Sequence, residues 1–244
     1  METVKTATVL VVEDDNEIRE LIRLYLIKNG LRVAEASDGA TALREFENVR
    51  PDLVLLDIQL PGESGLEVCE RIRGVSNVPI IFVSARGESE DIVHGLQLGA
   101  DDYIPKPFDP AVVVARVKAN LRRAPIYRRF EPAAPQAAAH ERNVSGKGVH
   151  IDTKKMTVHA DGREVRLSAK EFQLLAFLAS RPGEVFAATD LYERVWGSDS
   201  NDDPRTVMVH IYNMRKKLEA DPAHPQYIVS VRGMGYRFRG TADR

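Results

Sequence analysis

The chain is poor in cysteine and has no long apolar run. Its single cysteine, Cys69, excludes an internal disulfide and a metal site built from several thiolates, as is typical of proteins from reducing compartments. No stretch approaches the ~20 apolar residues that a membrane-spanning helix needs. The first eight residues mix acidic and basic side chains and do not resemble a secretory leader. We therefore expect a cytoplasmic protein without a membrane partner.

Length and charge favour two domains with different partners. The 244 residues suit two ordinary domains, and the composition, 43% hydrophobic and 29% charged, is that of a globular protein. Acidic side chains outnumber basic ones in residues 1–123, whereas basic ones prevail in residues 124–244. This asymmetry is hidden in a net charge of −2. It favours a cation site in the first half and an anionic partner for the second.

Residues 8–121 alternate short β-branched runs with amphipathic helical stretches, a pattern typical of a parallel sheet flanked by helices. The pattern predicts an α/β domain at residues 1–123, with a five-stranded, doubly wound parallel sheet of the flavodoxin type. The helix before the last strand is marked by Ile92 and Leu96. The expected strands are Thr8–Val12, Arg32–Ala36, Asp52–Asp57, Pro79–Ser84 and Tyr103–Pro105.

The rest of the chain predicts a linker and a second, smaller domain. Residues 124–148 contain three prolines and an alanine tract without apolar periodicity, as flexible linkers do. Residues 149–244 contain strands, three helical stretches and a terminal hairpin, which predicts an α+β winged helix-turn-helix domain. Its expected strands are Val149–Asp152, Met156–Ala160, Glu164–Leu167, Tyr227–Arg232 and Tyr236–Arg239, and its helices begin near Ser168, Thr189 and Arg205.

Polar side chains stand at the ends of the strands predicted in the first domain. Glu13 and Asp14 follow the first strand, Asp57 and Ser84 end the third and fourth, and Lys106 follows the fifth. In an open parallel sheet, ligands bind beyond these carboxyl ends. Clustered carboxylates repel one another unless a cation or protons neutralise them, and Mg²⁺ accepts oxygen ligands together with phosphate. The sequence therefore predicts a magnesium and phosphate site.

Each of these residues also has an ordinary structural explanation. Asp15, beside the acidic pair, stands where a helix N-cap is expected, and capping explains it better than metal binding. Ser84 and Lys106, taken one at a time, are equally well explained as surface residues. Asp57 is not, because the apolar run Leu53–Leu56 holds its carboxylate at the end of a buried strand.

Motifs in the first domain resemble the receiver domains of two-component response regulators. The resemblance covers residues 7–123, and the order of the motifs is specific. The motifs are Val11-Val12-Glu13-Asp14-Asp15, Leu55-Leu56-Asp57, Leu60-Pro61-Gly62, Ser84-Ala85-Arg86, Gly99-Ala100-Asp101-Asp102-Tyr103 and Lys106-Pro107-Phe108.

This resemblance implies a metal site and a phosphoacceptor. Mg²⁺ would be held by Glu13, Asp14, Asp57 and the backbone carbonyl of Gln59. Asp57 would also be the nucleophile that takes a phosphoryl group from the phosphohistidine of a partner sensor histidine kinase.

The same resemblance assigns roles to the residues around the phosphoryl group. Ser84 would donate a hydrogen bond to it, and Lys106 would pair with its oxygens. Tyr103 would fill the space that Ser84 leaves when it moves inward. The peptide bond between Lys106 and Pro107 would be cis.

Motifs in the second domain resemble the OmpR/PhoB-type winged-helix effector domain. The match runs from about residue 149 to 240, and it implies that the helix Arg205–Leu218 lies in the major groove of DNA and that Arg232 enters the minor groove. The motifs are Leu167-Ser168-Ala169-Lys170-Glu171-Phe172, Val195-Trp196-Gly197, Arg205-Thr206-Val207, His210-Ile211, Arg215-Lys216-Lys217-Leu218 and Val231-Arg232-Gly233-Met234-Gly235-Tyr236.

The helix near residues 205–219 carries an apolar stripe for the core and a second, mixed stripe. Basic side chains beside a core stripe usually form only a solvent-exposed face of the helix. Further arginines in the terminal hairpin favour a DNA-binding role instead. Asn213 replaces an arginine of some relatives, and asparagine suits adenine where arginine suits guanine. The loop Gly197–Pro204 is a candidate contact for RNA polymerase, with plain solvent exposure as the alternative. The expected DNA-binding residues are Arg205, Thr206, Val209, His210, Asn213, Arg215, Lys217 and Arg232.

Relatives of the receiver type dimerise through the fourth helix, fifth strand and fifth helix. Two charged pairs suited to this interface are Asp102 with Arg116 and Asp101 with Arg123. At another ion-pair position of the family, both partners are apolar, namely Ile92 and Val112. Because joint apolar replacement of a buried ion pair can be neutral or stabilising, we expect these two to pack across the two-fold axis. The alternative is that both belong to their own subunit's core.

Two other functions compete with this interpretation. A phosphatase-like hydrolase would also use Asp57 as nucleophile, but it needs a second acid two residues on, where Gln59 stands. A regulator that ignores phosphorylation would not need Glu13, Asp14 and Lys106 together. We therefore expect a transcription regulator of a two-component system, not an enzyme. In this interpretation, phosphorylation of Asp57 promotes receiver dimerisation and binding to tandem half-sites in promoter DNA.

Overall fold

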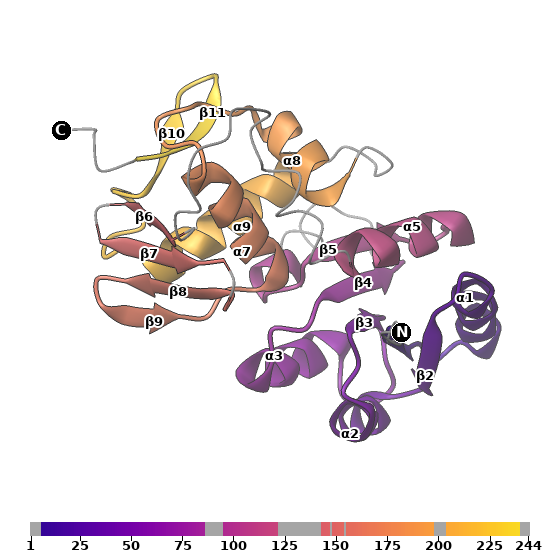
Figure 1. Cartoon of the computed structure of the whole chain (residues 1–244). Coiled ribbons are helices and arrows are strands. Elements are labelled where there is room, and N and C mark those ends of the chain that lie inside the picture. Colours follow the sequence, from indigo (N-terminus) through magenta and orange to yellow (C-terminus); the bar gives the residue numbers. More distant parts are fainter. Residues whose placement is uncertain are drawn as a thin grey trace, which may run out of the picture. The chain divides into compact units, whose positions relative to one another are not determined.

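The computed structural model describes residues 6–85, 95–121, 148–153, 155–197 and 204–239, together with the backbone of residues 143–146. The chain divides after Leu121 into two compact units. Figure 1 shows an α/β unit in indigo to magenta and a second unit in orange to yellow. None of the helices in these described ranges is both long and apolar enough to cross a membrane.

The first unit is a five-stranded parallel sheet in the order β2-β1-β3-β4-β5 with helices on both faces, which confirms the predicted doubly wound α/β fold. Helices α1 and α5 cover one face and α2 and α3 the other (Figure 1). The strands are β1 (Thr8–Val12), β2 (Arg32–Ala36), β3 (Leu53–Leu56), β4 (Ile80–Ser84) and β5 (Asp102–Pro105). The helices are α1 (Asn16–Lys28), α2 (Gly39–Val49), α3 (Gly65–Val75) and α5 (Pro110–Leu121).

Burial on both faces explains the continuous apolar runs of the central strands. Every residue of β1, β3 and β4 is buried, as expected for parallel strands covered by helices. Cys69, on α3, is buried among them, and burial raises the pKa of its thiol to about 12. Asp15 caps α1 by accepting from the backbone N–H groups of Glu17 and Ile18 at 2.8 and 3.1 Å, which confirms its structural role.

The second unit joins an antiparallel sheet, three helices and a two-stranded wing around one apolar core. This arrangement confirms the predicted α+β fold. Its strands are β6 (Asn143–Gly146), β7 (Val149–Asp152), β8 (Thr157–Ala160) and β9 (Arg163–Val165) in one sheet, and β10 (Ile228–Val231) and β11 (Gly235–Phe238) in the wing. Its helices are α7 (Ala169–Ala179), α8 (Ala188–Trp196) and α9 (Pro204–Leu218).

Strand β6 corrects the expected linker, which was placed at residues 124–148. Asn143–Gly146 pair antiparallel with Val149–Asp152. The tight reversal uses Gly148, whose φ is +86°, a left-handed value that glycine adopts at little cost. Such a strand pairs through its backbone, so the lack of apolar alternation did not reveal it. Residues 122–142 of the predicted linker lie outside the described ranges, as does the segment 86–94 with Ile92.

Candidate metal centre and nucleic-acid interface

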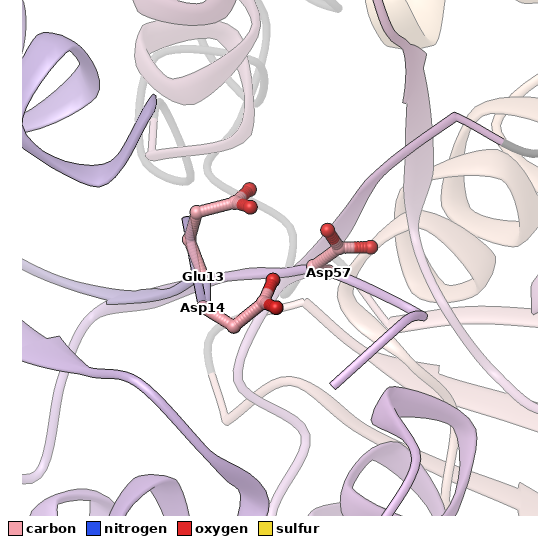
Figure 2. A group of neighbouring side chains, drawn as sticks. All are labelled: Glu13, Asp14 and Asp57. Carbon is pink, nitrogen blue, oxygen red and sulfur yellow. The ribbon is translucent and has the colours of Figure 1, made fainter. Parts of the chain in front are cut away.

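Three carboxylates meet at the carboxyl edge of the parallel sheet. Glu13 and Asp14 follow β1, and Asp57 follows β3, its neighbour in the sheet. Each residue offers an oxygen within 4.8 Å of those of the other two, and their carboxyl groups point toward a common space (Figure 2). Glu13 and Asp57 are buried, whereas Asp14 is exposed. Hard oxygen ligands with one open side suit Mg²⁺ better than a softer metal.

Lys106 lies between two of these carboxylates. Its ammonium nitrogen is 2.6 Å from Asp57 Oδ2 and 2.8 Å from the carboxylate of Glu13. Although partial burial by itself would lower the pKa of Lys106, its hydrogen bonds to Asp57 and Glu13 outweigh that effect and raise it. The lysine therefore remains a cation, and it lies where charge neutralisation is needed.

Glu13 shows how costly the cluster is. Burial, together with the charge of Asp57, raises the pKa of Glu13 to about 7, although the hydrogen bond from Lys106 opposes both effects. The carboxylates of Glu13, Asp14 and Asp57 thus form an acidic cluster that could hold a metal ion.

Ser84 and Tyr103 lie together, as the resemblance implied. Ser84 ends β4 and is fully buried, and the hydroxyl of Tyr103, also buried, lies 3.5 Å from its carbonyl oxygen. The backbone N–H of Gln59 donates to Asp57 Oδ1 at 2.9 Å, which orients the acceptor carboxylate. The peptide bond between Lys106 and Pro107 is cis, as expected.

A glycine that was not singled out from the sequence lies against the loop that follows Asp57. Gly65 begins α3, and its N–H donates to the carbonyl of Ile58 at 3.0 Å. A Cβ atom at this position would lie 1.9 Å from the carbonyl oxygen of Asp57. No side chain fits there unless helix or loop moves. The motif spacing from Asp57 was the only signal that could have identified it.

Asp101, one of the residues expected at the dimer interface, has polar partners within its own unit. This residue is fully buried, and its carboxylate accepts from Arg73 at 2.7 Å and from the N–H of Ile80 at 3.0 Å. Arg73 also donates to the carbonyl oxygens of Gly99 and Val78. Asp101 therefore joins α3 to the loop before β5 within one chain.

The other residues expected at the dimer interface differ in burial, and two of them are not among the described residues. Asp102 and Arg116 are both buried and form an ion pair at 2.6 Å within the chain, so the charges predicted to pair across the two-fold axis are joined internally. Val112 is half-buried on α5. Ile92 and Arg123 fall outside the described residues.

Helix α9 of the second unit buries more of its surface than the sequence suggested. The expected core stripe is buried, and so are Thr206, Val209, His210 and Asn213. The imidazole of His210 lies against Trp196 of α8, with ring centroids 5.1 Å apart. Packing against the neighbouring helix is thus one structural task of a residue expected to contact DNA.

The basic residues predicted to contact DNA divide into two groups. Arg205 at the start of α9 and Arg232 at the wing tip are exposed. Arg215 donates from Nε to the carbonyl of Ile228 at 2.9 Å, and Lys217 pairs with buried Glu171 at 2.6 Å. The latter two have structural partners within the domain.

An exposed stripe of α9 was missed by the sequence reasoning. Met208 and Tyr212 are about half exposed, and the ammonium of Lys216 lies 5.1 Å from the centre of the Tyr212 ring. These residues follow Arg205 at helical spacing. Because Met208 and Tyr212 are hydrophobic, the sequence alone did not distinguish them from the residues of the core stripe. Only the packing of the helix in the structure shows that they are exposed.

Comparisons with known proteins agree with both units. The family model "Response regulator receiver domain" matches residues 9–118, and "Transcriptional regulatory protein, C terminal" matches residues 162–238. Sensory transduction protein RegX3 of Mycolicibacterium smegmatis is 40% identical over 233 residues, covering 96% of this chain and 99% of RegX3. DNA-binding response regulator MtrA of the same organism is 42% identical over 229 residues, covering 94% and 95%.

A solved structure of a RitR mutant resembles the chain with a TM-score of 0.74 and 25% identity, covering 96% of this chain and 99% of that one. A receiver domain followed by a winged-helix domain defines a DNA-binding response regulator. The chain belongs to the OmpR/PhoB family of two-component response regulators. It is a transcription regulator and not an enzyme.

The Arg73 assignment predicts a large effect on stability. Replacing Arg73 with alanine removes the cation from the buried Asp101 carboxylate, so we expect the free energy of unfolding to fall by ~3–5 kcal/mol. Arg71→Ala, on the same helix, is the matched control. The side chain of Arg71 is 63% exposed in its pair with Glu63, so its loss should cost ~0–1 kcal/mol. Urea unfolding of the full chain measures both, and equal effects would contradict the assignment.

Proposed function

We propose that the chain takes a phosphoryl group from a sensor histidine kinase onto Asp57 and then binds promoter DNA as a dimer. The observation that carries this proposal is the position of Lys106, 2.6 Å from Asp57 and 2.8 Å from Glu13 in an acidic cluster at the sheet edge. Phosphoryl transfer needs a positioned nucleophile and cations for the oxygens, with little other covalent work. This site provides the nucleophile and one of the cations.

The residues present fit Mg²⁺, which would be held by Glu13, Asp14, Asp57 and the backbone carbonyl of Gln59. Bound there, the metal would supply positive charge that shields Asp57 from the phosphoryl oxygens. Positive charge of a bound metal would favour the deprotonated carboxylate of Glu13 and so oppose the burial that raises its pKa.

Each neighbour of Asp57 has a distinct task in the proposed reaction. The N–H of Gln59 orients the carboxylate. Lys106 is placed to pair with oxygens of the incoming group, and Ser84 supplies a hydroxyl from the end of β4. The added phosphoryl group brings about −1.5 to −2 charge. Because Tyr103 already lies on the backbone of Ser84, a shift of Ser84 reaches β5 directly.

Dimerisation is proposed through the face of β5 and α5, with Val112 packing against Ile92 of the partner subunit. The charges of Asp101, Asp102 and Arg116 are joined within the chain, so they are not needed to hold the dimer together. The proposed interface therefore depends more on apolar contacts than on ion pairs.

In the proposed DNA complex, α9 lies in the major groove and the wing carries Arg232 into the minor groove, with two subunits on half-sites about one helical turn apart. Exposed Arg205 and Arg232 supply charge for the phosphates. Asn213 of α9 is proposed to read an adenine edge, although it is buried in the structure. The loop Gly197–Pro204 is a candidate contact for RNA polymerase, and the site of action is the cytoplasm.

Asp57→Asn tests the phosphoacceptor. With acetyl phosphate and Mg²⁺, the wild-type chain should gain the mass of one phosphoryl group, whereas the variant should gain none because its amide is not a nucleophile. Intact-protein mass spectrometry measures this, and circular dichroism checks that the fold is unchanged. Full labelling of the variant would sink the assignment of Asp57.

Gly65→Ala tests whether α3 positions the acceptor. The added methyl must displace the Asp57 backbone, so we expect phosphorylation by acetyl phosphate to slow at least tenfold, a rate effect typical of small misplacements. Gly74→Ala is the matched control on the same helix, because a Cβ there meets no atom within 4 Å. Rates that fall equally in both variants, or in neither, would show that contact at Gly65 does not set the geometry.

Arg232→Ala and Asn213→Ala test the two parts of the DNA surface. Arg232→Ala should weaken binding to all duplexes. It should also reduce the slope of the logarithm of the binding constant against the logarithm of the salt concentration by about one charge. Asn213→Ala should relax preference at one or two base pairs, by ~1–3 kcal/mol for a bidentate contact. Lys155→Ala, an exposed basic residue in the turn between β7 and β8, controls for loss of charge. All three variants are compared with the wild-type chain by selection from a random duplex library. Wild-type affinity and selectivity in both Arg232→Ala and Asn213→Ala would refute the proposed placement of α9 and the wing on DNA.

A further inference from the structure

The segment that leads into the wing is bound by a single buried carboxylate. Glu219, directly after α9, accepts from three consecutive backbone N–H groups, those of Gln226 at 2.7 Å, Tyr227 at 2.8 Å and Ile228 at 3.0 Å. Glu219 is only 4% exposed. A carboxylate with several N–H donors forms short, charge-assisted hydrogen bonds, and losing it would leave these buried donors unsatisfied.

A second side chain binds the same strand one helical turn earlier. Arg215 donates from Nε to the carbonyl of Ile228 at 2.9 Å and from a terminal nitrogen to Ser230 Oγ at 3.0 Å. Its guanidinium carbon lies 6.0 Å from the centre of the Tyr236 ring on the other wing strand. Ile228 is therefore held at its N–H by Glu219 and at its carbonyl by Arg215.

The other wing strand is anchored separately. Tyr236 exchanges two backbone hydrogen bonds with Phe186, both 2.9 Å, and a Cβ at Gly235 would lie 1.9 Å from the carbonyl oxygen of Phe186. The base of the wing is thus fixed on both strands, while its tip with Arg232 and Met234 is exposed. Strand β10 is the wing strand that is joined to α9. Glu219 and Arg215 provide most of the polar contacts between that strand and the helix.

We propose that Glu219 is a positioning residue for DNA reading. With Arg215, it joins the wing to α9 so that Arg232 is held at a set distance from the helix. This inference rests on the proposed DNA-binding function and deepens it, because the two reading elements then act as one rigid unit. Both anchors bind mainly backbone groups, so they set the path of the strand independently of its side chains.

A double-mutant cycle on DNA binding tests the proposal in the full chain, with the duplex that the wild-type protein selects from a random library. In the wild-type background, Arg232→Ala should weaken binding about tenfold, a usual effect of one specific side-chain contact. In the Glu219→Ala background, the same change should weaken it less than about twofold, because a loosened wing no longer places Arg232. Hydrogen exchange at residues 226–228 should quicken in Glu219→Ala.

Two further variants keep the test decisive. Glu164→Ala removes an exposed carboxylate of the same domain and should leave the effect of Arg232→Ala at about tenfold. Glu219→Gln retains one acceptor oxygen, so it should give an intermediate effect and replaces Glu219→Ala if that variant does not fold. An unchanged effect of Arg232→Ala in the Glu219 variants overturns the positioning role. A wild-type chain that selects no duplex overturns the DNA-binding proposal, and this inference with it.

Discussion

Mutual repulsion among the carboxylates of Glu13, Asp14 and Asp57 is the constraint on which the receiver unit depends. Burial of the strand ends raises the pKa of Glu13 to about 7 and thereby shows the cost of holding these groups together. Lys106 offsets part of that cost, because its amine lies between two of the carboxylates. A cluster of carboxylates that is unfavourable for folding in this way could bind a cation.

The parallel sheet holds the site in place, and close backbone contacts refine it. Completely buried strands bring β1 and β3 side by side, so residues far apart in sequence end at one edge. Gly65 then allows α3 to approach the backbone of Asp57 more closely than any side chain would permit. Arg73 and Asp101 join α3 to the loop before β5, the strand that carries Tyr103. Asp57 and Tyr103 are therefore parts of one packed arrangement.

Basic residues of the second unit fall into two structural groups, those bound inside the domain and those exposed on its surface. Amino-acid composition alone does not distinguish the two groups. Arg215 and Lys217 are bound to groups within the domain, Ile228 and Glu171, whereas Arg205 and Arg232 are exposed. A positive charge that is held internally contributes to the rigidity of the winged helix. An exposed one places its positive charge on the surface of the unit. The cost of leaving a buried carboxylate such as Glu171 unpaired explains why the internal pairs form.

The sequence by itself determined the order of strands and helices and the acidic set Glu13, Asp14 and Asp57, because apolar periodicity and strand-end position are local properties. It also determined that Asp15 is a helix cap. Only the tertiary structure showed β6 within the expected linker, the internal partner of Asp101, and the burial of His210 against Trp196. These features depend on which groups meet across the fold. Spacing along the chain cannot reveal whether an arginine finds its carboxylate in the same domain or in another molecule.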